Sequence, residues 1–415
     1  HLARMAALAA KAVEDAKAPL MVESSTDRRA VLKDADFVVL SFADHSVKYR
    51  GVDCEIALKY KIRMCSGDTI GPGGIMRTLR ELPVILDCCR DIEELCPKAW
   101  VINYINPTAA HGVGLRIFAP QLKTFALCDG LHMPRVKQTY ALRAGIIEKV
   151  EDYSEEVDRD FDLRLAGPNH FTWIIKAQYK GEDVAGRIAE AIRRIGQKEV
   201  EGGDLGAKAK HNEEITYQLY KAFGCIPACT AHTKEYVRFW QGLGLLTETV
   251  PPLSVWETGL RYERHWAMWN QVDSFNYGVK PMSDFWKELG PDHATDIIET
   301  MVGGLGKPFY INTANAGSVS NLPDDAFIEV LCDATMDGVT PRVSGPIPVG
   351  VRGLCQQVLD THELTARAAA TGDRDLLYRA FCTDPLTNSL ADSRAMIEDL
   401  LKAQRDVLPD YWRKG

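Results

Sequence analysis

The stretch Phe125-Ala126-Leu127-Cys128-Asp129-Gly130 is a short apolar run that ends abruptly at a thiol and a carboxylate. Apolar runs of this kind are typical of strands that are buried on both faces of a parallel sheet. Because such sheets bind ligands at the carboxyl ends of their strands, the run predicts that Cys128 and Asp129 face a cleft. His170 is a candidate for the other half of the site, since a thiolate and an imidazole together suit a borderline divalent metal ion.

Two earlier apolar runs, at 35–41 and 100–103, repeat the pattern, and helix-like segments at 75–95 and 108–118 lie between the runs. Alternation of strands and helices at this spacing predicts an α/β fold with a Rossmann-like, doubly wound parallel sheet. The carboxyl ends of the three strands should therefore converge on one cleft. These ends lie at Ser41, at 103–106 and at 128–129.

The start of the chain contains local signals of its own. An amphipathic, helix-like run begins at His1, and residues 19–23 have the pattern of a short strand. Residues 24–27 predict a turn whose last residue, Asp27, caps a helix that extends through Lys33. Because the chain enters the first run directly at His1, we expect the native protein to have further residues in front of it.

From about residue 150 the pattern changes to broken acidic segments followed by helical ones. Helices are predicted around 184–194, 212–223, 364–370 and 391–407. Residues 250–291 are rich in Trp and charge and match no single element. A chain of 415 residues predicts two domains, 1–148 and 149–415, and the absence of a low-complexity linker predicts a broad interface between them.

Composition excludes several classes of protein. The formal net charge of -8 and the lack of a basic run argue against a nucleic-acid partner. No apolar stretch approaches the roughly 20 residues that cross a bilayer, and no signal peptide is evident, so we expect no membrane partner. Eleven cysteines, an odd number that includes the adjacent pair Cys88-Cys89, suit a reducing cytoplasm better than a disulfide framework.

A glycine-rich segment at 66–77 leads into a predicted helix. Glycines at a helix start allow backbone N–H groups to approach an anionic ligand, but the same residues also form a simple tight turn. The dinucleotide fingerprint of G-x-G-x-x-G after the first strand is absent. The segment at 103–107 is similarly ambiguous, because an Asn before Pro can bind a sugar hydroxyl or ribose and is also common in turns.

The residues around Cys128 and His170 also leave alternatives open. A buried cysteine at a strand end, or a single histidine, is more often structural than metal-binding. His132, Cys225, Cys229 and His232 are further candidate ligands, but they lack the paired spacing of a structural zinc site. Spacing alone does not decide among them.

The order of these segments resembles glycoside hydrolase family 4, the NAD- and metal-dependent glycosidases. The resemblance spans nearly the whole chain and rests on many short pieces together. The pieces are Thr26-Asp27-Arg28-Arg29, Gly67-Asp68-Thr69, Gly71-Pro72-Gly73-Gly74, Asn103-Tyr104, Asn106-Pro107, Cys128, Asn169-His170, Ala222-Phe223-Gly224, Glu235-Tyr236, Asn321-Leu322-Pro323, Thr371-Gly372-Asp373 and Asp384-Pro385-Leu386.

The resemblance implies a specific chemistry, which is an exception to the usual mechanism of two carboxylates. NAD oxidises the sugar at C3, a base removes the acidified proton at C2, and the glycosidic oxygen leaves by elimination. Water then adds and the ketone is reduced again. The resemblance also implies a dehydrogenase-like fold with a NAD-binding domain at 1–148, a catalytic and oligomerisation domain at 149–415, and a homodimer or homotetramer.

The roles of individual residues follow from the same resemblance. Cys128 and His170 would hold Mn²⁺ or another divalent ion, Asp129 would protonate the leaving group, and Tyr236 is the candidate base. The predicted contacts with NAD come from Thr26, Asp27, Ser41 and Asn103. The predicted contacts with substrate come from Asp68, Arg77, Asn106, Asn169 and Arg261.

The chain departs from the family pattern in three places. The first strand and the glycine-rich nucleotide turn have no counterpart ahead of His1. The residues after Asp129, Gly130-Leu131-His132-Met133-Pro134, match neither the phospho-α-glucosidases nor the α-galactosidases of the family. The region 259–269 is unusually cationic and aromatic and is either a solvated face or a site for a phosphate, carboxylate or sulfonate of the substrate.

Two other functions compete with a glycosidase. An NAD-dependent 2-hydroxy acid dehydrogenase of the lactate and malate type would use the same sheet and the same Asn-Pro segment. It would have no need of the pair formed by Cys128 and His170. A non-enzymatic nucleotide-binding protein would leave the same pair idle.

Overall fold

The computed structural model describes residues 1–43, 46–201, 211–245, 252–290 and 292–413, and describes the backbone alone for Asp129. Within these residues ten strands form one mixed sheet. Eight of them follow the order β1-β2-β3-β8-β9-β4-β5-β6, while β10 pairs with β9 and β7 pairs with β5. The strands are β1 (Phe37–Leu40), β2 (Trp100–Asn103), β3 (Lys123–Ala126), β4 (Phe161–Gly167), β5 (Trp173–Tyr179), β6 (Glu182–Asp183), β7 (Ile226–Pro227), β8 (Pro308–Ala314), β9 (Phe327–Ala334) and β10 (Val339–Pro341).

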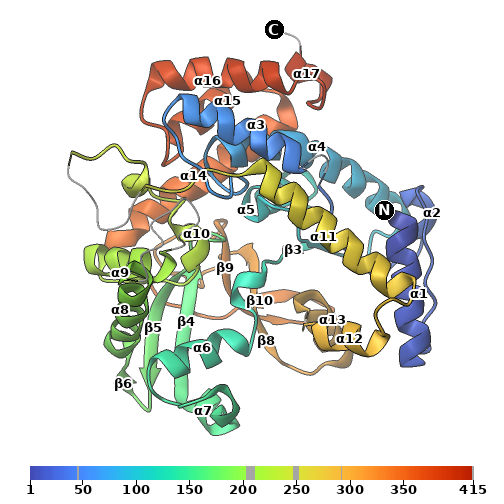
Figure 1. The fold of residues 1–415 in the computed structure, drawn as a ribbon, viewed down its shortest axis with the longest axis horizontal. Helices are drawn as coiled ribbons and strands as arrows, with labels where there is room; N and C mark the ends of the chain where they lie inside the picture. The colour runs from blue at the N-terminus through green and yellow to red at the C-terminus, as the bar shows by residue number, and fades with distance from the viewer. Residues whose placement is uncertain (44–45, 202–210, 246–251, 291, 414–415) are drawn as a thin grey trace.

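Helices cover this sheet on both faces and extend beyond it (Figure 1). Those of the first half are α1 (Leu2–Ala16), α2 (Arg28–Leu32), α3 (Ser46–Lys59), α4 (Gly71–Leu95), α5 (Thr108–Phe118), α6 (Arg135–Arg143), α7 (Glu155–Asp160), α8 (Ala185–Glu201) and α9 (Asn212–Phe223). Those of the second half are α10 (Thr230–Thr233), α11 (Thr258–Asn276), α12 (Met282–Glu288), α13 (His293–Gly303), α14 (Val349–Thr371), α15 (Arg374–Thr383), α16 (Leu390–Ala403) and α17 (Asp410–Arg413). None of the helices in the described ranges is long and apolar enough to span a membrane.

The first three strands are parallel, and their side chains pack into two different cores. Val101 and Ala126 belong to the core under α4 and α5, whereas Ile102 and Phe125 belong to the core on the other face. The prediction of strands buried on both faces of a parallel sheet is therefore confirmed. The remaining strands pair antiparallel and begin where β8 joins β3.

Helices near the C-terminus pack into the same core as the first strands of the chain. Helices α14, α15 and α16 pack against α3, α4 and α5 (Figure 1). Their buried residues share one apolar core with those of β1 and β2. The division into 1–148 and 149–415 stays a prediction.

The register of the parallel strands explains why the predicted site residues share one edge of the sheet. Leu40 pairs with Asn103, and Asn103 pairs with Ala126, so the three strands end level with one another. The backbone N–H of Leu127 still donates to the carbonyl of Asn103 at 2.9 Å, which carries this alignment one residue past β3. Ser41 and Cys128 therefore lie at the same edge of the sheet.

Two expectations about local structure have different outcomes. Asp27 caps α2 as predicted, because its carboxylate accepts a hydrogen bond from the N–H of Arg29. The strand predicted at 19–23 is wrong. Leu20 and Met21 are 68% and 84% exposed, and the segment pairs with none of the strands that the structure describes. A short apolar run needs a neighbouring strand to satisfy its backbone, and this one has none in those ranges.

Residues 250–291, which the sequence left unassigned, contain α11 and α12. Helix α11 packs against α1 and α3. Arg4 of α1 pairs with Asp273 at 2.5 Å and lies over the ring of Trp269. Side chains of this region therefore hold α11 against two helices from the N-terminal part of the chain.

Candidate active site

Cys128 and His170 meet at the carboxyl edge of the parallel strands. Sγ of Cys128 lies 2.9 Å from Nε2 of His170. Cys128 follows β3 and directly precedes the single turn of 3-10 helix at Asp129–Leu131. His170 is buried in the turn between β4 and β5 and has a left-handed backbone with φ of 63°. The predicted pair is therefore brought together by two separate parts of the sheet.

The turn that presents His170 depends on a glycine and on a buried carboxylate. A Cβ atom at Gly167 would lie 2.7 Å from the carbonyl oxygen of Phe171, so a larger residue cannot fit there. Glu329 of β9 lies beneath the turn and accepts a hydrogen bond from the hydroxyl of Thr172 at 2.8 Å. Burial raises the pKa of Glu329. The sequence analysis did not identify Glu329, because Thr172, its partner in this turn, lies 157 residues away along the chain.

Other thiol and imidazole groups gather around the pair. The ring of His232 stacks on that of His170, with centroids 4.2 Å apart and planes 10° apart. A Cβ atom on Gly130 would lie 3.9 Å from Sγ of Cys128 and 4.0 Å from Sγ of Cys229. Burial, together with the neighbouring His170, lowers the pKa of His232 to about 4, so this ring is neutral near pH 7.

The remaining candidate ligands lie elsewhere. Cys225 is buried in the core, where its thiol donates to the carbonyl of Ile174 at 3.2 Å. Nε2 of His132 lies 3.1 Å from a carboxylate oxygen of Asp296. His293 packs edge-on against His132 and contacts the carbonyl of Cys128 through Nδ1 at 3.3 Å. His132 is therefore connected to Cys128 through His293.

The donor set suits a catalytic metal ion better than a structural one. Within the described ranges, no group of three or more His, Cys, Asp or Glu side chains is arranged to hold a metal. A thiolate and a neutral imidazole are suitable ligands for a borderline divalent ion. An ion bound by these two groups keeps positions open for oxygen ligands, which is the property that distinguishes catalytic from structural sites.

A buried ion-pair network follows the glycine-rich segment. Asp68 accepts from Arg77 at 2.8 Å and pairs with Arg50 at 3.1 Å, and Arg77 also pairs with Glu81. Burial of Asp68 favours its neutral form, but the positive charges of Arg50 and Arg77 outweigh that effect and lower its pKa. Burial raises the pKa of Glu81 to about 7. The network therefore has a net positive charge.

Arg261 belongs to the same cluster. Its guanidinium lies 4.4 Å from the ring centroid of Trp256, and that of Arg50 lies 4.0 Å from the same centroid. The structure thus brings together three of the five residues predicted to contact substrate, namely Asp68, Arg77 and Arg261. Three arginines gathered beside Asp68 and Glu81 favour an anionic group.

The glycines in the first turn of α4 serve internal packing. A Cβ atom at Gly73 would lie 2.3 Å from the carbonyl oxygen of Gly67. The N–H of Gly71 donates to a carboxyl oxygen of Asp384 at 2.8 Å, so an acidic side chain of the chain itself lies at this helix start. Of the two interpretations of this segment, the tight turn fits these contacts.

A second carboxylate holds the same segment from the other side. Oε1 of Glu235 accepts from the N–H groups of Cys65 and Ser66 at 2.6 and 2.7 Å. Glu235 is 2% exposed. The sequence analysis included Glu235 in the match of Glu235-Tyr236 to the family, but it predicted a role only for the tyrosine.

The other residues predicted to bind substrate or cofactor differ in burial and in their hydrogen-bond partners. Asn106 is half-buried, and its Oδ1 accepts from the hydroxyl of Thr108. Asn103 is buried, and its amide exchanges hydrogen bonds with the backbone of Ile105, so it closes the loop after β2. Asn169 is buried beside His170, and Ser41 is exposed after β1.

Thr26 and Asp27 directly precede α2, a short helix that is paired with α4. Asp27 caps its own helix, and the next two residues, Arg28 and Arg29, both pair with Asp91 of α4. Thr26 is exposed. Their role in binding NAD stays a prediction.

The two predicted acid–base residues also remain untested. The side chain of Asp129 lies outside the described residues. Tyr236 is 2% exposed, and its ring stacks on Phe171, with centroids 5.2 Å apart. Burial raises the pKa of the Tyr236 phenol well above its ordinary value. A nearby positive charge is therefore needed before Tyr236 can act as a base.

The sequence matches one family of enzymes over most of its length. The model of the Family 4 glycosyl hydrolase matches residues 1–140, and that of the Family 4 glycosyl hydrolase C-terminal domain matches residues 165–387. The chain belongs to this family and is therefore a glycoside hydrolase.

Individual relatives agree with this assignment. An alpha-galactosidase of Bacillus subtilis (strain 168) is 30% identical over 94% of this chain and 85% of the relative. An alpha-galacturonidase of Thermoanaerobacterium saccharolyticum is 28% identical over 96% of this chain and 86% of the relative. The crystal structure of a 6-phospho-alpha-glucosidase from gut microorganisms, in complex with NAD and Mn²⁺, has a TM-score of 0.76 and 20% identity over 98% of this chain and 89% of that one.

Proposed function

We propose that the protein is an NAD- and Mn²⁺-dependent glycosidase that acts on a hexoside bearing an anionic group. The observation that carries the proposal is the contact between Cys128 and His170 at the carboxyl edge of a Rossmann-like sheet. The solved relative binds NAD and Mn²⁺. NAD supplies a hydride acceptor for C3 of the sugar, and the metal ion supplies a Lewis acid for the sugar oxygens.

Residues of the chain bind the ion, position the sugar, transfer the protons and contact NAD. Cys128 and His170 hold the ion, while Asn106 and Asn169 position sugar hydroxyls. Tyr236 removes the proton at C2, and Asp129 gives a proton to the departing glycosidic oxygen. Contacts with NAD come from Ser41 and Asn103 at the sheet edge and from Thr26 and Asp27.

The anionic group is inferred from charge. Arg50 and Arg77 both pair with Asp68, Arg261 lies over the same Trp256 ring as Arg50, and Glu81 is only partly ionised near pH 7. A carboxylate or phosphate of the sugar would complete the charge balance. One relative is named an alpha-galacturonidase, which refers to an acidic sugar.

The compartment, the oligomeric state and the domain division of the enzyme are also part of the proposal. All eleven cysteines are free, which fits a reducing cytoplasm. A homodimer or homotetramer is the expected assembly, and light scattering after gel filtration measures its mass. Residues 1–148 are proposed as the nucleotide domain and 149–415 as the catalytic domain.

A panel of nitrophenyl glycosides with neutral, phosphorylated, uronic and sulfonated sugars tests the activity in the presence of NAD and Mn²⁺. We expect Cys128→Ala and His170→Ala to abolish turnover and to leave the circular dichroism spectrum unchanged. Cys382→Ala, which removes another partly buried thiol, serves as the control and should retain full activity. Full activity in both site variants would contradict the metal assignment.

A further inference from the structure

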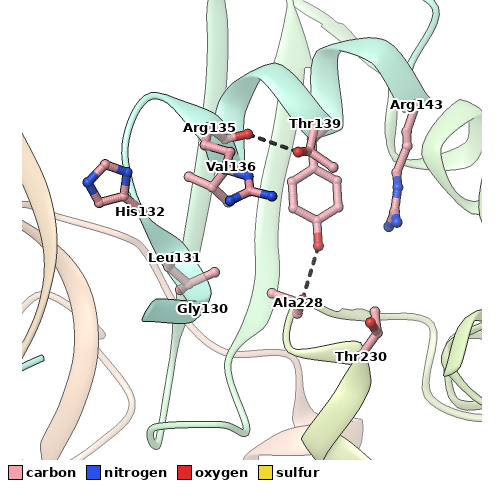
Figure 2. A pocket seen from close by; sticks show the side chains of 10 residues that line it. Gly130, Leu131, His132, Arg135, Val136, Thr139, Arg143, Ala228 and Thr230 are labelled. Carbon is pink, nitrogen blue, oxygen red and sulfur yellow. Dashed lines mark hydrogen bonds between the residues drawn. The ribbon is translucent and has the colours of Figure 1, made fainter. Parts of the chain in front are cut away.

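A cavity of about 310 Å³ adjoins Cys128, and none of Arg50, Arg77 and Arg261 lines it. Gly130 and Leu131 form one wall, Ala228 and Thr230 lie opposite, and α6 covers the space with Arg135 and Arg143 (Figure 2). None of the residues predicted from the sequence to bind substrate lines it.

The walls of the cavity favour a negative charge. The ten described residues that line it include no Asp or Glu. Arg143 is already paired with Glu213, and His132 is paired with Asp296. Arg135 lies in the first turn of α6 and is exposed, and no carboxylate of the described ranges forms an ion pair with it. Its guanidinium is therefore available to a ligand.

The cavity also has the right neighbours for a leaving group. Gly130 lines it, and a Cβ atom there would lie 3.9 Å from Sγ of Cys128. Asp129, the residue proposed to protonate the glycosidic oxygen, directly precedes Gly130. A group that departs with a proton from Asp129 would therefore leave beside this space.

We propose that this cavity is the subsite for the leaving group of the glycoside, and that Arg135 selects a leaving group with a carboxylate. The inference rests on the proposed function, and it adds a second anion site to the cluster of Arg50, Arg77 and Arg261. The walls suit such a group: Arg135 and Thr139 offer polar contacts, while Leu131 and Val136 offer apolar ones. The proposal concerns only how the leaving group is bound, and it adds no chemical step to the hydrolysis.

Paired substrates test the subsite. The wild type and Arg135→Gln are assayed with the 4-carboxyphenyl and phenyl glycosides of the sugar that the wild type hydrolyses fastest. Each variant is compared with the wild type on the same substrate, so intrinsic differences in reactivity cancel. A hydrogen-bonded ion pair of this kind corresponds to about a tenfold to hundredfold effect. We expect Arg135→Gln to lower kcat/KM by that factor for the carboxyphenyl glycoside and by less than about twofold for the phenyl glycoside.

Lys137 provides a matched control, because it carries the same charge two residues along α6 and contacts Asp158 outside the cavity. Lys137→Gln should leave both substrates unchanged. Equal losses for the two substrates, or no loss, would overturn the subsite.

A binding measurement tests the subsite independently of the proposed function, because it does not require turnover. If the wild type hydrolyses no glycoside, the proposed function fails, and titration calorimetry with 4-hydroxybenzoate and phenol decides the subsite instead. Tighter binding of 4-hydroxybenzoate that is lost in Arg135→Gln supports the anion site. Equal binding to both proteins contradicts it.

Discussion

Nε2 of His170 lies 2.9 Å from Sγ of Cys128, although 42 residues separate them in the chain. If the two groups share a metal ion, dialysis against EDTA should abolish turnover in the presence of NAD, and Mn²⁺ should restore it in the wild type. His170→Ala should stay inactive after the same addition, because its remaining thiolate cannot retain the ion. Activity that survives EDTA would contradict the assignment.

The ion pair of Arg77 with Asp68 should be essential for stability. Arg77→Met leaves Glu81 buried without its cationic partner and leaves Asp68 with Arg50 alone. Breaking a buried pair costs about 3–5 kcal/mol. Urea unfolding at pH 7 measures this loss. Arg90→Met on the same helix breaks an exposed pair with Asp87 and should change the midpoint little; equal effects would contradict the argument.

Buried histidines should make the protein sensitive to acid. Burial lowers the pKa of His362 to about 4, from an ordinary value of 6.5. The unfolded chain therefore binds more protons between these values, so the stabilisation is fully present above pH 6.5 and is lost as the pH falls toward 4. The loss from His362 is about 3 kcal/mol.

Thermal unfolding between pH 4 and 7 tests this prediction. His362→Gln should flatten the dependence of Tm on pH, because it removes the buried imidazole whose pKa is lowered. Identical slopes in the His362 variant and the wild type would argue against the role of this histidine.

Glu235 should position the loop that carries Asp68. Its carboxylate accepts from the N–H groups of Cys65 and Ser66, and charged hydrogen bonds of this kind contribute about 1.5–3 kcal/mol. Glu235→Gln should lower Tm and raise KM more than it lowers kcat, because the loop would shift while the acid–base groups remain. An unchanged KM with a lowered Tm would limit Glu235 to a structural role.

The sequence predicted the parts of the fold that depend on local pattern. The three parallel strands were visible because each is a continuous apolar run, and α4 and α5 because they fill the crossovers between them. Residues 19–23 have a similar apolar pattern but form no strand, since pairing depends on a neighbour that the pattern does not specify. Helix α11 was missed because its tryptophans and charges contact α1 and α3, which lie far away in the chain.

The site was predictable to the extent that its residues are reactive types at strand ends. Cys128 satisfied that condition, whereas His170 was singled out as a metal-binding type by the order of motifs. Glu235, Glu329 and Asp384 could not be found in the same way, because each is one carboxylate whose role is set by distant contacts. The cavity at Arg135 likewise depends on how α6 packs over the residues that follow β7.

Deuterium at C2 of the product tests the central claim most directly. Hydrolysis is run in D2O with NAD and Mn²⁺, and the released sugar is analysed by NMR. If the C2 proton is removed during each turnover, the product should carry deuterium at C2. A product that retains hydrogen at C2 would contradict the elimination route and favour direct displacement at C1.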